Sequence, residues 1–326
     1  MKAGPVLAAV AGIAAGAGLI AYFGAGAVAR SLFAIGWAGL AAICLIHLAL
    51  IAIMGLAWRA LLPTAGPAIM IWGRLIRDSA SEALPLSQVG GYVLGARAVA
   101  LGGISGTDAT ASTIVDVTLE FLAQVAYTAL ALAWLVRLRP DAAMVVPVSL
   151  GLVVAVLAAV GFVAVQRHGL RFFDRCAQVL GRGWAERTAA SATQLHIAIA
   201  AIYRRRGGLW WSLLLHLACW VGSGVEAWIA LHLAGAPLPF GAIMVIESLL
   251  YATRTVAFAI PNAVGVQEAA YVLLGGTFGL TPELALALSL MKRARDLIIG
   301  IPALAAWQAV EGGRLWGVRL EKPMRE

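Results

Sequence analysis

Four charged residues lie near the middle of a segment that is otherwise long and apolar enough to cross a bilayer. The segment is Glu283–Val310, and its central charges are Lys292, Arg293, Arg295 and Asp296. A cation at the centre of a bilayer costs at least about 2.5–3.5 kcal/mol on insertion scales, so such residues usually face a polar cavity or an opposite charge. The segment therefore predicts a helix of a membrane-embedded protein with a polar site inside it.

The composition of the whole chain agrees with a membrane location. Of 326 residues, 62% are hydrophobic and only 12% are charged, and the mean hydropathy is +0.90. Soluble domains are about half apolar and lack apolar runs of bilayer length. Transmembrane β-barrels show short segments of alternating hydrophobicity, which the sequence does not contain. We therefore predict an all-α integral membrane protein.

Six apolar stretches have the length of a bilayer span, and two further stretches are broken. The six predicted spans are Val6–Phe23, Ile35–Ala57, Asp108–Val136, Ala142–Val165, Leu209–Ala234 and Glu283–Val310. The stretches Ala68–Gly103 and Phe240–Gly279 contain proline and glycine, so each is too interrupted for one straight helix and too short for two spans. We interpret both as re-entrant helical hairpins. Lys2 and Ala27-Val28-Ala29 loosely imitate a signal peptide, but the length of the first run favours an uncleaved helix.

The distribution of arginine predicts how the chain crosses the membrane. The connection 166–208 contains eight arginines and only two acidic residues, which places it on the cytoplasmic side by the positive-inside rule. Such flanking cations explain the net charge of +8 better than nucleic-acid binding does. The span Ile35–Ala57 would then run inward and deliver Arg59, Arg74 and Arg77 to the cytoplasm. Both the N- and the C-terminus are predicted to be cytoplasmic.

Two span–hairpin–span units of opposite orientation follow from this topology. Residues 35–136 form the first unit, with hairpin 68–103, and residues 209–310 form the second, with hairpin 240–279. The expected architecture is one membrane domain over residues 1–326. It has about six transmembrane helices plus two re-entrant helical hairpins in an inverted repeat, as in many transporters.

Proline marks the tip of each predicted hairpin. Pro85 and Pro261 remove a backbone donor, and the helices that begin after them point positive N-termini inward, which suits a phosphate or another anion. Because the hairpins enter from opposite sides, we expect the two prolines to approach one another near the bilayer midplane. Glu268, about two turns past Pro261, either contacts substrate or pairs with Arg254 or Arg295 in a structural role.

Ionisable residues inside the apolar stretches are further candidates for a translocation site. Asp116 and Glu120 are four residues apart and share a helix face, so a cation is expected between them, with Arg97 as the candidate. The residues assigned to substrate binding and translocation are Pro85, Gln88, Arg97, Asp116, Glu120, Glu226, Arg254, Pro261, Asn262, Glu268, Arg293, Arg295 and Asp296. The charged ones are expected mostly to face the protein interior, because lipid-exposed charge is costly.

No motif in the sequence identifies an enzyme, a metal site or a nucleotide site. The motifs G-x-S-x-G and H-E-x-x-H, the P-loop and an Asp-rich prenyl-diphosphate motif are missing. His47, His216 and His232 lie in spans and have no set of neighbouring ligands that would define a metal site, and the three cysteines are scattered. We therefore predict no metal, no cofactor and no catalytic residue. Lipid movement without an ATP site would be downhill or ion-coupled.

At the second hairpin tip and the following span, the sequence resembles a known family. Pro261-Asn-Ala-Val-Gly-Val-Gln-Glu268 followed by Lys292-Arg-Ala-Arg-Asp296 looks like the P-x-x-x-G-x-x-E … R pattern of the flippase-like transmembrane region of lysylphosphatidylglycerol synthases. The segment Arg77–Gly91 with Gly95-Ala-Arg97 is similar to the hopanoid-associated HpnL-like subgroup. The family often has Gly-Glu after the first proline, where this chain has Gly90-Gly91-Tyr92.

The resemblance covers almost the whole chain and implies lipid translocation in the bacterial inner (cytoplasmic) membrane, without the aminoacyl-transferring soluble domain. The predicted function is a lipid transporter, or flippase, that moves a hopanoid, glycolipid or phospholipid between leaflets. Arg293 and Arg295 are expected to bind the head group if it is anionic.

Two alternatives to transport remain open at the level of the sequence. The first is a membrane enzyme that modifies a lipid or polyprenyl-phosphate head group, with Asp116, Glu120 or Glu268 as base. The second is a scaffold for lipid-synthesis enzymes. The expected partners are a membrane lipid and such enzymes, with no nucleic acid.

Overall fold

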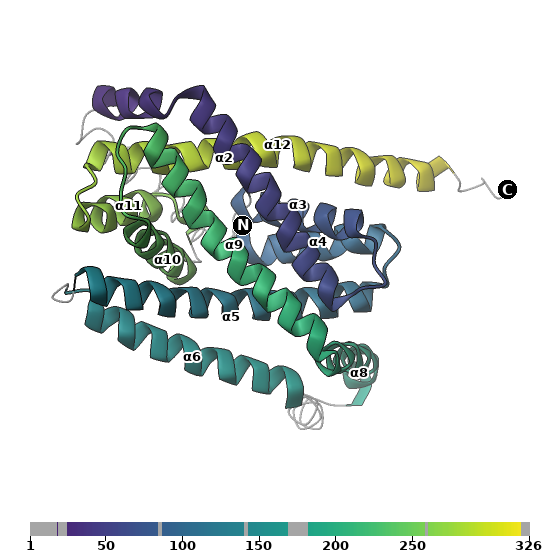
Figure 1. Cartoon of the computed structure of the whole chain (residues 1–326). Helices are drawn as coiled ribbons and strands as arrows, with labels where there is room; N and C mark the ends of the chain where they lie inside the picture. Colours follow the sequence, from purple (N-terminus) through teal and green to yellow (C-terminus); the bar gives the residue numbers. More distant parts are fainter. Residues whose placement is uncertain are drawn as a thin grey trace.

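The computed structural model describes residues 18, 25–83, 87–139, 143–168, 182–257 and 260–320. In this part of the chain every regular element is helical (Figure 1). The elements are α2 (Ala25–Leu61), α3 (Pro67–Ala83), α4 (Ser87–Leu101), α5 (Gly106–Leu138), α6 (Val145–His168), α8 (Arg182–Arg204), α9 (Arg206–Leu233), α10 (Phe240–Val256), the 3-10 helix η1 (Pro261–Ala263), α11 (Val266–Thr277) and α12 (Pro282–Leu320). The predicted all-α class is confirmed.

Four of the six predicted spans are helices long and apolar enough to cross a membrane. Within the described residues these helices are Ile35–Leu61, Gly106–Leu138, Val145–Arg167 and Arg206–Leu233. The first of them starts where α2 bends, at Gly36 with φ 69°. The predicted span Glu283–Val310 lies inside α12, a continuous helix of 39 residues, but its central charges leave no sufficiently apolar stretch. The remaining predicted span, Val6–Phe23, lies outside the described residues apart from Gly18.

The helices α2 and α9 run antiparallel and side by side across the molecule (Figure 1). The thiol of Cys219 lies 3.6 Å from the carbonyl oxygen of Leu50, and a Cβ on Gly222 would meet the Leu50 side chain. Near the other end of the pair, Gly208 lies against the carbonyl oxygen of Ala60. Small residues at these positions let the two backbones approach closely, which is a usual basis of helix association within a bilayer.

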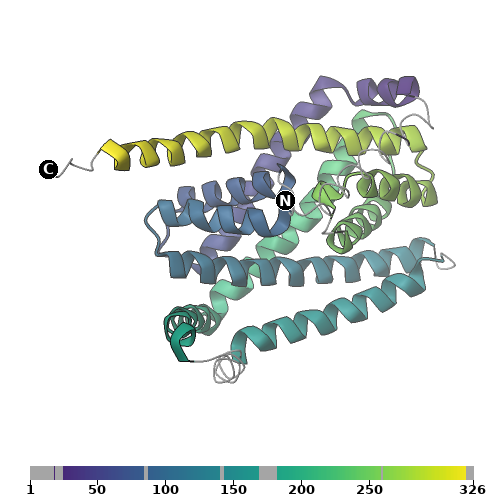
Figure 2. The same ribbon diagram turned by 180° about the vertical axis from the view of Figure 1, so that it is seen from behind.

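Each broken apolar stretch contains a pair of helices. In the first pair α3 and α4 run antiparallel, since Gly91 lies over Arg77 and Ser81 whereas Gly102 lies over Ile69. In the second pair α10 and α11 flank η1. The two pairs lie end to end between α12 and α5 (Figure 2). Each broken stretch therefore contains two helices, and the re-entrant hairpins stay a prediction.

The C-terminal part of α3 lies against the second helix pair. The first turn, with Pro85, lies outside the described residues, but Glu82 stands three residues before it at the end of α3. Arg254, near the end of α10, donates from Nη2 to both carboxylate oxygens of Glu82, at 2.8 and 2.9 Å, and to the side-chain oxygen of Asn262 at 3.1 Å. These contacts bring the end of α3 beside η1.

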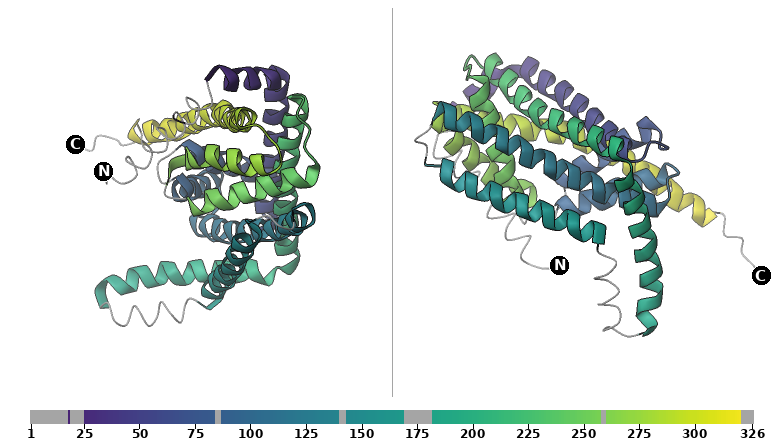
Figure 3. Two further views of the ribbon diagram at one scale, coloured as in Figure 1. Left: turned by 90° about the vertical axis from the view of Figure 1, so that its left-hand side faces the viewer. Right: turned by 60° about the horizontal axis from the view of Figure 1, so that its bottom comes forward.

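The basic connection 166–208, expected as a loop, is largely helical where it is described. Residues up to His168 continue α6, and α8 projects away from the other helices at its N-terminal end (Figure 3). Leu195, Ile199 and Ile202 of α8 lie on one helix face and pack in a cluster with Val115 of α5. This apolar face explains why part of the connection is helical, and its cytoplasmic placement stays a prediction.

Candidate functional site

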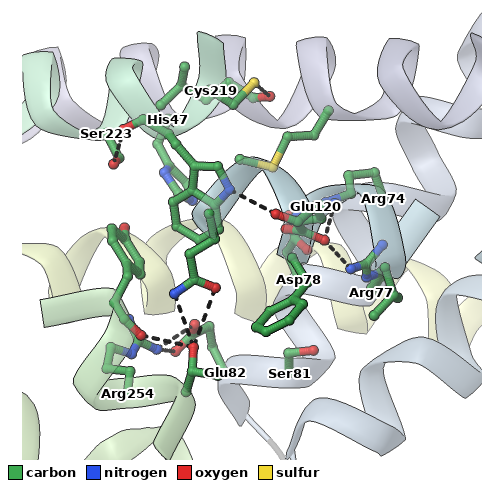
Figure 4. A pocket seen from close by; sticks show the side chains of 18 of the residues that line it. His47, Arg74, Arg77, Asp78, Ser81, Glu82, Glu120, Cys219, Ser223 and Arg254 are labelled. Atoms are coloured by element: carbon green, nitrogen blue, oxygen red, sulfur yellow. Dashed lines mark hydrogen bonds and ion pairs between the residues drawn. The ribbon is translucent and has the colours of Figure 1, made fainter. Parts of the chain in front are cut away.

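A cavity of about 390 Å³ lies where both helix pairs meet α2, α5, α9 and α12 (Figure 4). Four arginines and four carboxylates line it, together with aromatic and apolar side chains. The charged residues are Arg74, Arg77, Asp78, Glu82, Glu120, Arg254, Arg295 and Asp296, and the aromatic ones are Tyr92, Phe121, Phe162, Trp220 and Tyr251. A wall that mixes charged and apolar groups suits a molecule with a polar head and an apolar body.

Two arginines of α3 hold two carboxylates of α5 at one side of the cavity. Arg74 donates from Nη2 to Oε1 of Glu120 and from Nε to Oδ2 of Asp78, both at 2.7 Å. Arg77 donates from Nη1 to Oδ2 of Asp116 at 2.6 Å and from Nη2 to Oε2 of Glu120. The like charges that share one face of α5 are thus paired with two guanidinium groups, which offsets part of the cost of burying them.

The cation expected between Asp116 and Glu120 is not Arg97. Its side chain is 54% exposed, and it donates to Oε1 of Glu311 in α12 at 2.8 Å. The prediction is wrong because Arg97 lies on α4, whereas the helix that turns its charged face toward α5 is α3.

The charged residues on one face of α3 line the cavity but were not among the site residues predicted from the sequence. Arg74, Arg77, Asp78 and Glu82 follow one another at spacings of three, one and four, which places them on one side of a helix. This spacing in the sequence could have predicted that these four residues form a charged face of the site. The two arginines were predicted only as orientation signals, and the structure buries them, with 4% of Arg74 and 2% of Arg77 exposed; the side of the membrane on which they lie stays a prediction. An arginine at the edge of an apolar run has the same sequence context whether it flanks a span or enters a site.

The turn between α10 and α11 is held by Glu268. Its Oε2 accepts from the backbone N–H of Gly265 at 2.7 Å, and Arg293 donates to its Oε1 at 2.6 Å and to its Oε2 at 3.1 Å. Arg293 also donates to the backbone carbonyl of Asn262 at 3.3 Å. Asn262 and Ala263 have φ values of 49° and 45°, a left-handed conformation that is rare outside glycine. A turn with two such residues needs support from its surroundings.

The partners expected for Glu268 are bound elsewhere. Arg254 is engaged at the end of α3, and Arg295 donates to Oε1 of Glu226. The predicted pairing of Glu268 with either arginine is therefore wrong. The reason is the rotation of α12, which presents Arg293 to the turn and Arg295 to α9.

The centre of α12 contributes two further ion pairs. Lys292 donates to Oε2 of Glu247 at 2.5 Å, and Glu247 also accepts from the hydroxyl of Tyr271 at 2.6 Å. Arg295 donates to Oδ1 of Asp296 from Nε at 2.9 Å and from Nη2 at 2.6 Å. Each cation at the middle of α12 therefore has a carboxylate partner within the protein.

Two histidines contact carboxylates. Nε2 of His216 lies 2.9 Å from Oδ1 of Asp116, and Nδ1 of His47 lies 3.3 Å from Oε2 of Glu226. Among the residues that the structure describes, no group of three or more His, Cys, Asp or Glu side chains is arranged to hold a metal ion.

The predicted site residues fall into four groups. Those that line the cavity are Glu120, Arg254, Arg295 and Asp296. Those bonded to lining residues are Asp116, Glu226 and Asn262. Those that build or support the turn between α10 and α11 are Pro261, Glu268 and Arg293. The remaining ones are the exposed Arg97, Pro85 outside the described residues, and Gln88, whose side chain is not described.

Helices of spanning length around a charge-lined cavity define a multi-pass helical membrane protein with an internal polar site. The family model described as the lysylphosphatidylglycerol synthase TM region matches residues 9–303. The chain therefore belongs to this family, and the family resemblance at the second turn is confirmed. No curated protein and no solved structure matches the chain.

Proposed function

We propose that the protein is a lipid transporter that moves an amphipathic lipid between the two leaflets of a membrane. The observation that carries this proposal is the cavity of about 390 Å³, where eight charged side chains meet aromatic and apolar groups among helices of spanning length. Charges at bilayer depth are expensive and usually mark a substrate path. The head group would occupy the cavity while the apolar part of the lipid stays in the bilayer.

The proposal includes an inverted repeat with two re-entrant hairpins. The order of elements supports it, because α2, the pair α3–α4 and α5 are followed later by α9, the pair α10–α11 and α12. The antiparallel contact of α2 with α9, and the contact of Glu82 near the end of α3 with Arg254 beside η1, are what two opposed units would produce. In this arrangement both termini are cytoplasmic, the membrane is the bacterial inner membrane, and one unit rocks against the other.

The ion pairs around the cavity favour a head group that is zwitterionic or uncharged. All four lining arginines already donate to carboxylates, so a purely anionic group would have to displace a carboxylate. Arg293, the other cation expected to bind an anion, is engaged by Glu268. Glycolipids, hopanoids with polar heads and zwitterionic phospholipids meet this requirement. Membership of the hopanoid-associated subgroup, and with it a hopanoid substrate, stays a prediction from the segment Arg77–Gly91.

The two alternatives to transport have less support. A scaffold would have a solidly packed interior rather than a cavity. A membrane enzyme would need a free base, whereas Asp116, Glu120 and Glu268 each accept hydrogen bonds from arginine. Association with lipid-synthesis enzymes is compatible with transport and stays a prediction.

Leaflet exchange by the purified protein tests the proposal. The protein is reconstituted into phosphatidylcholine vesicles that carry traces of fluorescent phosphatidylethanolamine, phosphatidylglycerol or a glycolipid, and dithionite bleaches the label that reaches the outer leaflet. The variant R254Q removes a cavity arginine, and R97Q is its matched control because Arg97 is 54% exposed and bonded to Glu311.

We expect wild type and R97Q to exchange at the same rate. R254Q should be at least about tenfold slower, which is the effect of losing one charge-assisted hydrogen bond of about 1.5 kcal/mol. Exchange of every labelled lipid at the rate of protein-free vesicles would refute the proposal.

A further inference from the structure

A second cavity lies between α5 and α9, at the point where α9 begins. This groove of about 240 Å³ is lined by Leu119 of α5 and by Arg206, Leu209, Trp210 and Leu213 of α9. None of these residues lines the charged cavity of about 390 Å³. Arg206 stands about two turns before Leu213 on the same helix, so the groove is basic at one end and apolar toward the other.

Arginines gather at the basic end of this groove. Arg204–Arg206 are consecutive and exposed, and in the described part of the chain none of their side chains makes a hydrogen bond or an ion pair. Arg167, also exposed, lies at the same end of the bundle, because the hydroxyl of Tyr203 donates to its neighbour Gln166 at 2.8 Å (Figure 1). This corner of the bundle therefore presents four cations that no described carboxylate neutralises.

The groove leads from the level of the lipid phosphates into the acyl-chain region. The helix of spanning length Arg206–Leu233 begins at the last of the three consecutive arginines, and the start of a spanning helix lies at the bilayer surface. Trp210 and Trp211 follow about one turn later and are 64% and 65% exposed, as is usual for tryptophan in the interfacial zone. Leu213 lies one turn deeper, where the bilayer offers only hydrocarbon.

We propose that this groove binds one anionic phospholipid, which is held at the protein surface and is not the lipid that the central cavity would transport. Its phosphate accepts hydrogen bonds from Arg205 and Arg206, and one of its acyl chains lies along Leu119, Leu209 and Leu213. Basic clusters at the membrane end of a helix, and basic pockets between helices, are typical binding sites of acidic lipids.

Charge and shape together select this occupant. Four cations without carboxylate partners attract a phosphate but repel the ammonium group of a zwitterionic head group, so an anionic head group is favoured. An acidic peptide could pair with the same arginines, but it would leave the apolar part of the groove without a partner. A phospholipid fills both parts at once, because its phosphate and its acyl chains stand at the two depths that the groove connects.

Native mass spectrometry of the purified, delipidated protein in detergent tests the site by counting the lipids that each molecule binds. Dioleoylphosphatidylglycerol is the anionic probe, and dioleoylphosphatidylcholine, which has the same acyl chains, is the zwitterionic one. The variant R205Q/R206Q removes two of the cations. R137Q/R139Q is the matched control, because Arg137 and Arg139 are exposed near the other end of α5 and neither lines the groove.

We expect wild type and R137Q/R139Q to bind the first phosphatidylglycerol with the same affinity, and more tightly than phosphatidylcholine. Each lost interfacial arginine should weaken binding about fivefold, so R205Q/R206Q should bind phosphatidylglycerol about 25-fold more weakly and lose the preference for it. R205K/R206K keeps the charges and should keep the preference. L213F fills the groove while the arginines stay in place, and it should also weaken binding of the first phosphatidylglycerol.

Three results would overturn the site. Equal weakening in R205Q/R206Q and in R137Q/R139Q would mean that the lipid responds to surface charge in general. Wild-type affinity in L213F would mean that the groove holds no acyl chain. Displacement of the lipid by sodium phosphate, beyond the effect of sodium chloride at the same ionic strength, would mean that the arginines bind a free anion. Circular dichroism and thermal midpoints establish that the variants are folded. Because binding alone is measured, the outcome does not depend on the proposed transport function.

Discussion

Replacement of Glu268 by alanine should destabilise the turn between α10 and α11 more than any other single carboxylate loss at that turn. The substitution removes the acceptor of the Gly265 N–H at 2.7 Å and both hydrogen bonds from Arg293, at 2.6 and 3.1 Å. It also removes the acceptor of Ser289 Oγ at 3.1 Å. The left-handed Asn262 and Ala263 then lose the group that ties their turn to α12.

The loss of stability in Glu268→Ala depends mainly on Arg293, which would keep its charge without its carboxylate partner. Breaking a buried ion pair by removing one partner costs about 3–5 kcal/mol. Arg293 keeps 16% exposure and the carbonyl contact to Asn262, so we expect the lower end, about 3 kcal/mol. Glu268→Gln keeps an oxygen for the Gly265 N–H but loses the charge, and should cost about 1.5 kcal/mol. In the double variant E268A/R293A the stranded charge is gone, so the loss should be smaller than the sum of the singles by about 1–3 kcal/mol.

Equilibrium unfolding in detergent micelles, followed by tryptophan fluorescence, measures these free energies. Glu311→Gln is the matched control, because its partner Arg97 is 54% exposed and such pairs contribute at most about 1 kcal/mol. Hydrogen exchange of the α11 amides localises the effect to the turn. If E268A and E311Q lost the same stability, or if the double-variant cycle showed strict additivity, the ion pair would not be what holds this turn.

Three further predictions concern the packing of α4 on α3, the buried hydroxyl of Tyr271 and the ion pair between Glu82 of α3 and Arg254 of α10. Gly95→Ala should lower the thermal midpoint and the free energy of unfolding, the latter by about 1–3 kcal/mol, because the added Cβ would lie 2.7 Å from the Cβ of Arg77 on α3. Gly106→Ala is the control: its Cβ would have nothing within 4 Å, so the free energy of unfolding should change by less than about 0.5 kcal/mol. Tyr271→Phe removes a donor that lies 2.6 Å from a carboxylate on α10 and should cost about 1.5–3 kcal/mol in the same unfolding assay. Glu82→Lys and Arg254→Glu should each slow leaflet exchange, and the charge-swapped double variant should recover part of the wild-type rate; no recovery would mean that their contact is not direct.

The sequence alone determined the helical elements and where they break. Apolar runs of bilayer length form helices whatever their neighbours are, because the backbone has no other partner in hydrocarbon. Four of the predicted spans are therefore helices in the structure, and a fifth, Glu283–Val310, lies entirely within α12. The break at Pro261 was equally local, since proline and the glycine at 265 favour a turn through their own backbone chemistry, whereas Pro302 lies inside the continuous helix α12.

The sequence also determined that charges had to be paired inside, but not which partners they take. A buried cation requires a carboxylate whatever the fold, and this requirement is visible in the composition of one span. Arg97 and Arg77 are both plausible partners of Asp116 by sequence position, and Arg254, Arg293 and Arg295 are all plausible partners of Glu268. Nothing local separates these choices.

Tertiary structure made the choice through the rotation and register of neighbouring helices. Successive residues of an α-helix are rotated by about 100° around its axis. Arg293 and Arg295 of α12 therefore point in different directions, Arg293 to Glu268 and Arg295 to Glu226 on α9. The same effect turns the Arg74 and Arg77 face of α3 toward α5 and leaves Arg97 of α4 outside. Helix rotation depends on contacts between residues more than a hundred positions apart, such as those of α2 with α9, and therefore becomes defined only when the whole bundle packs.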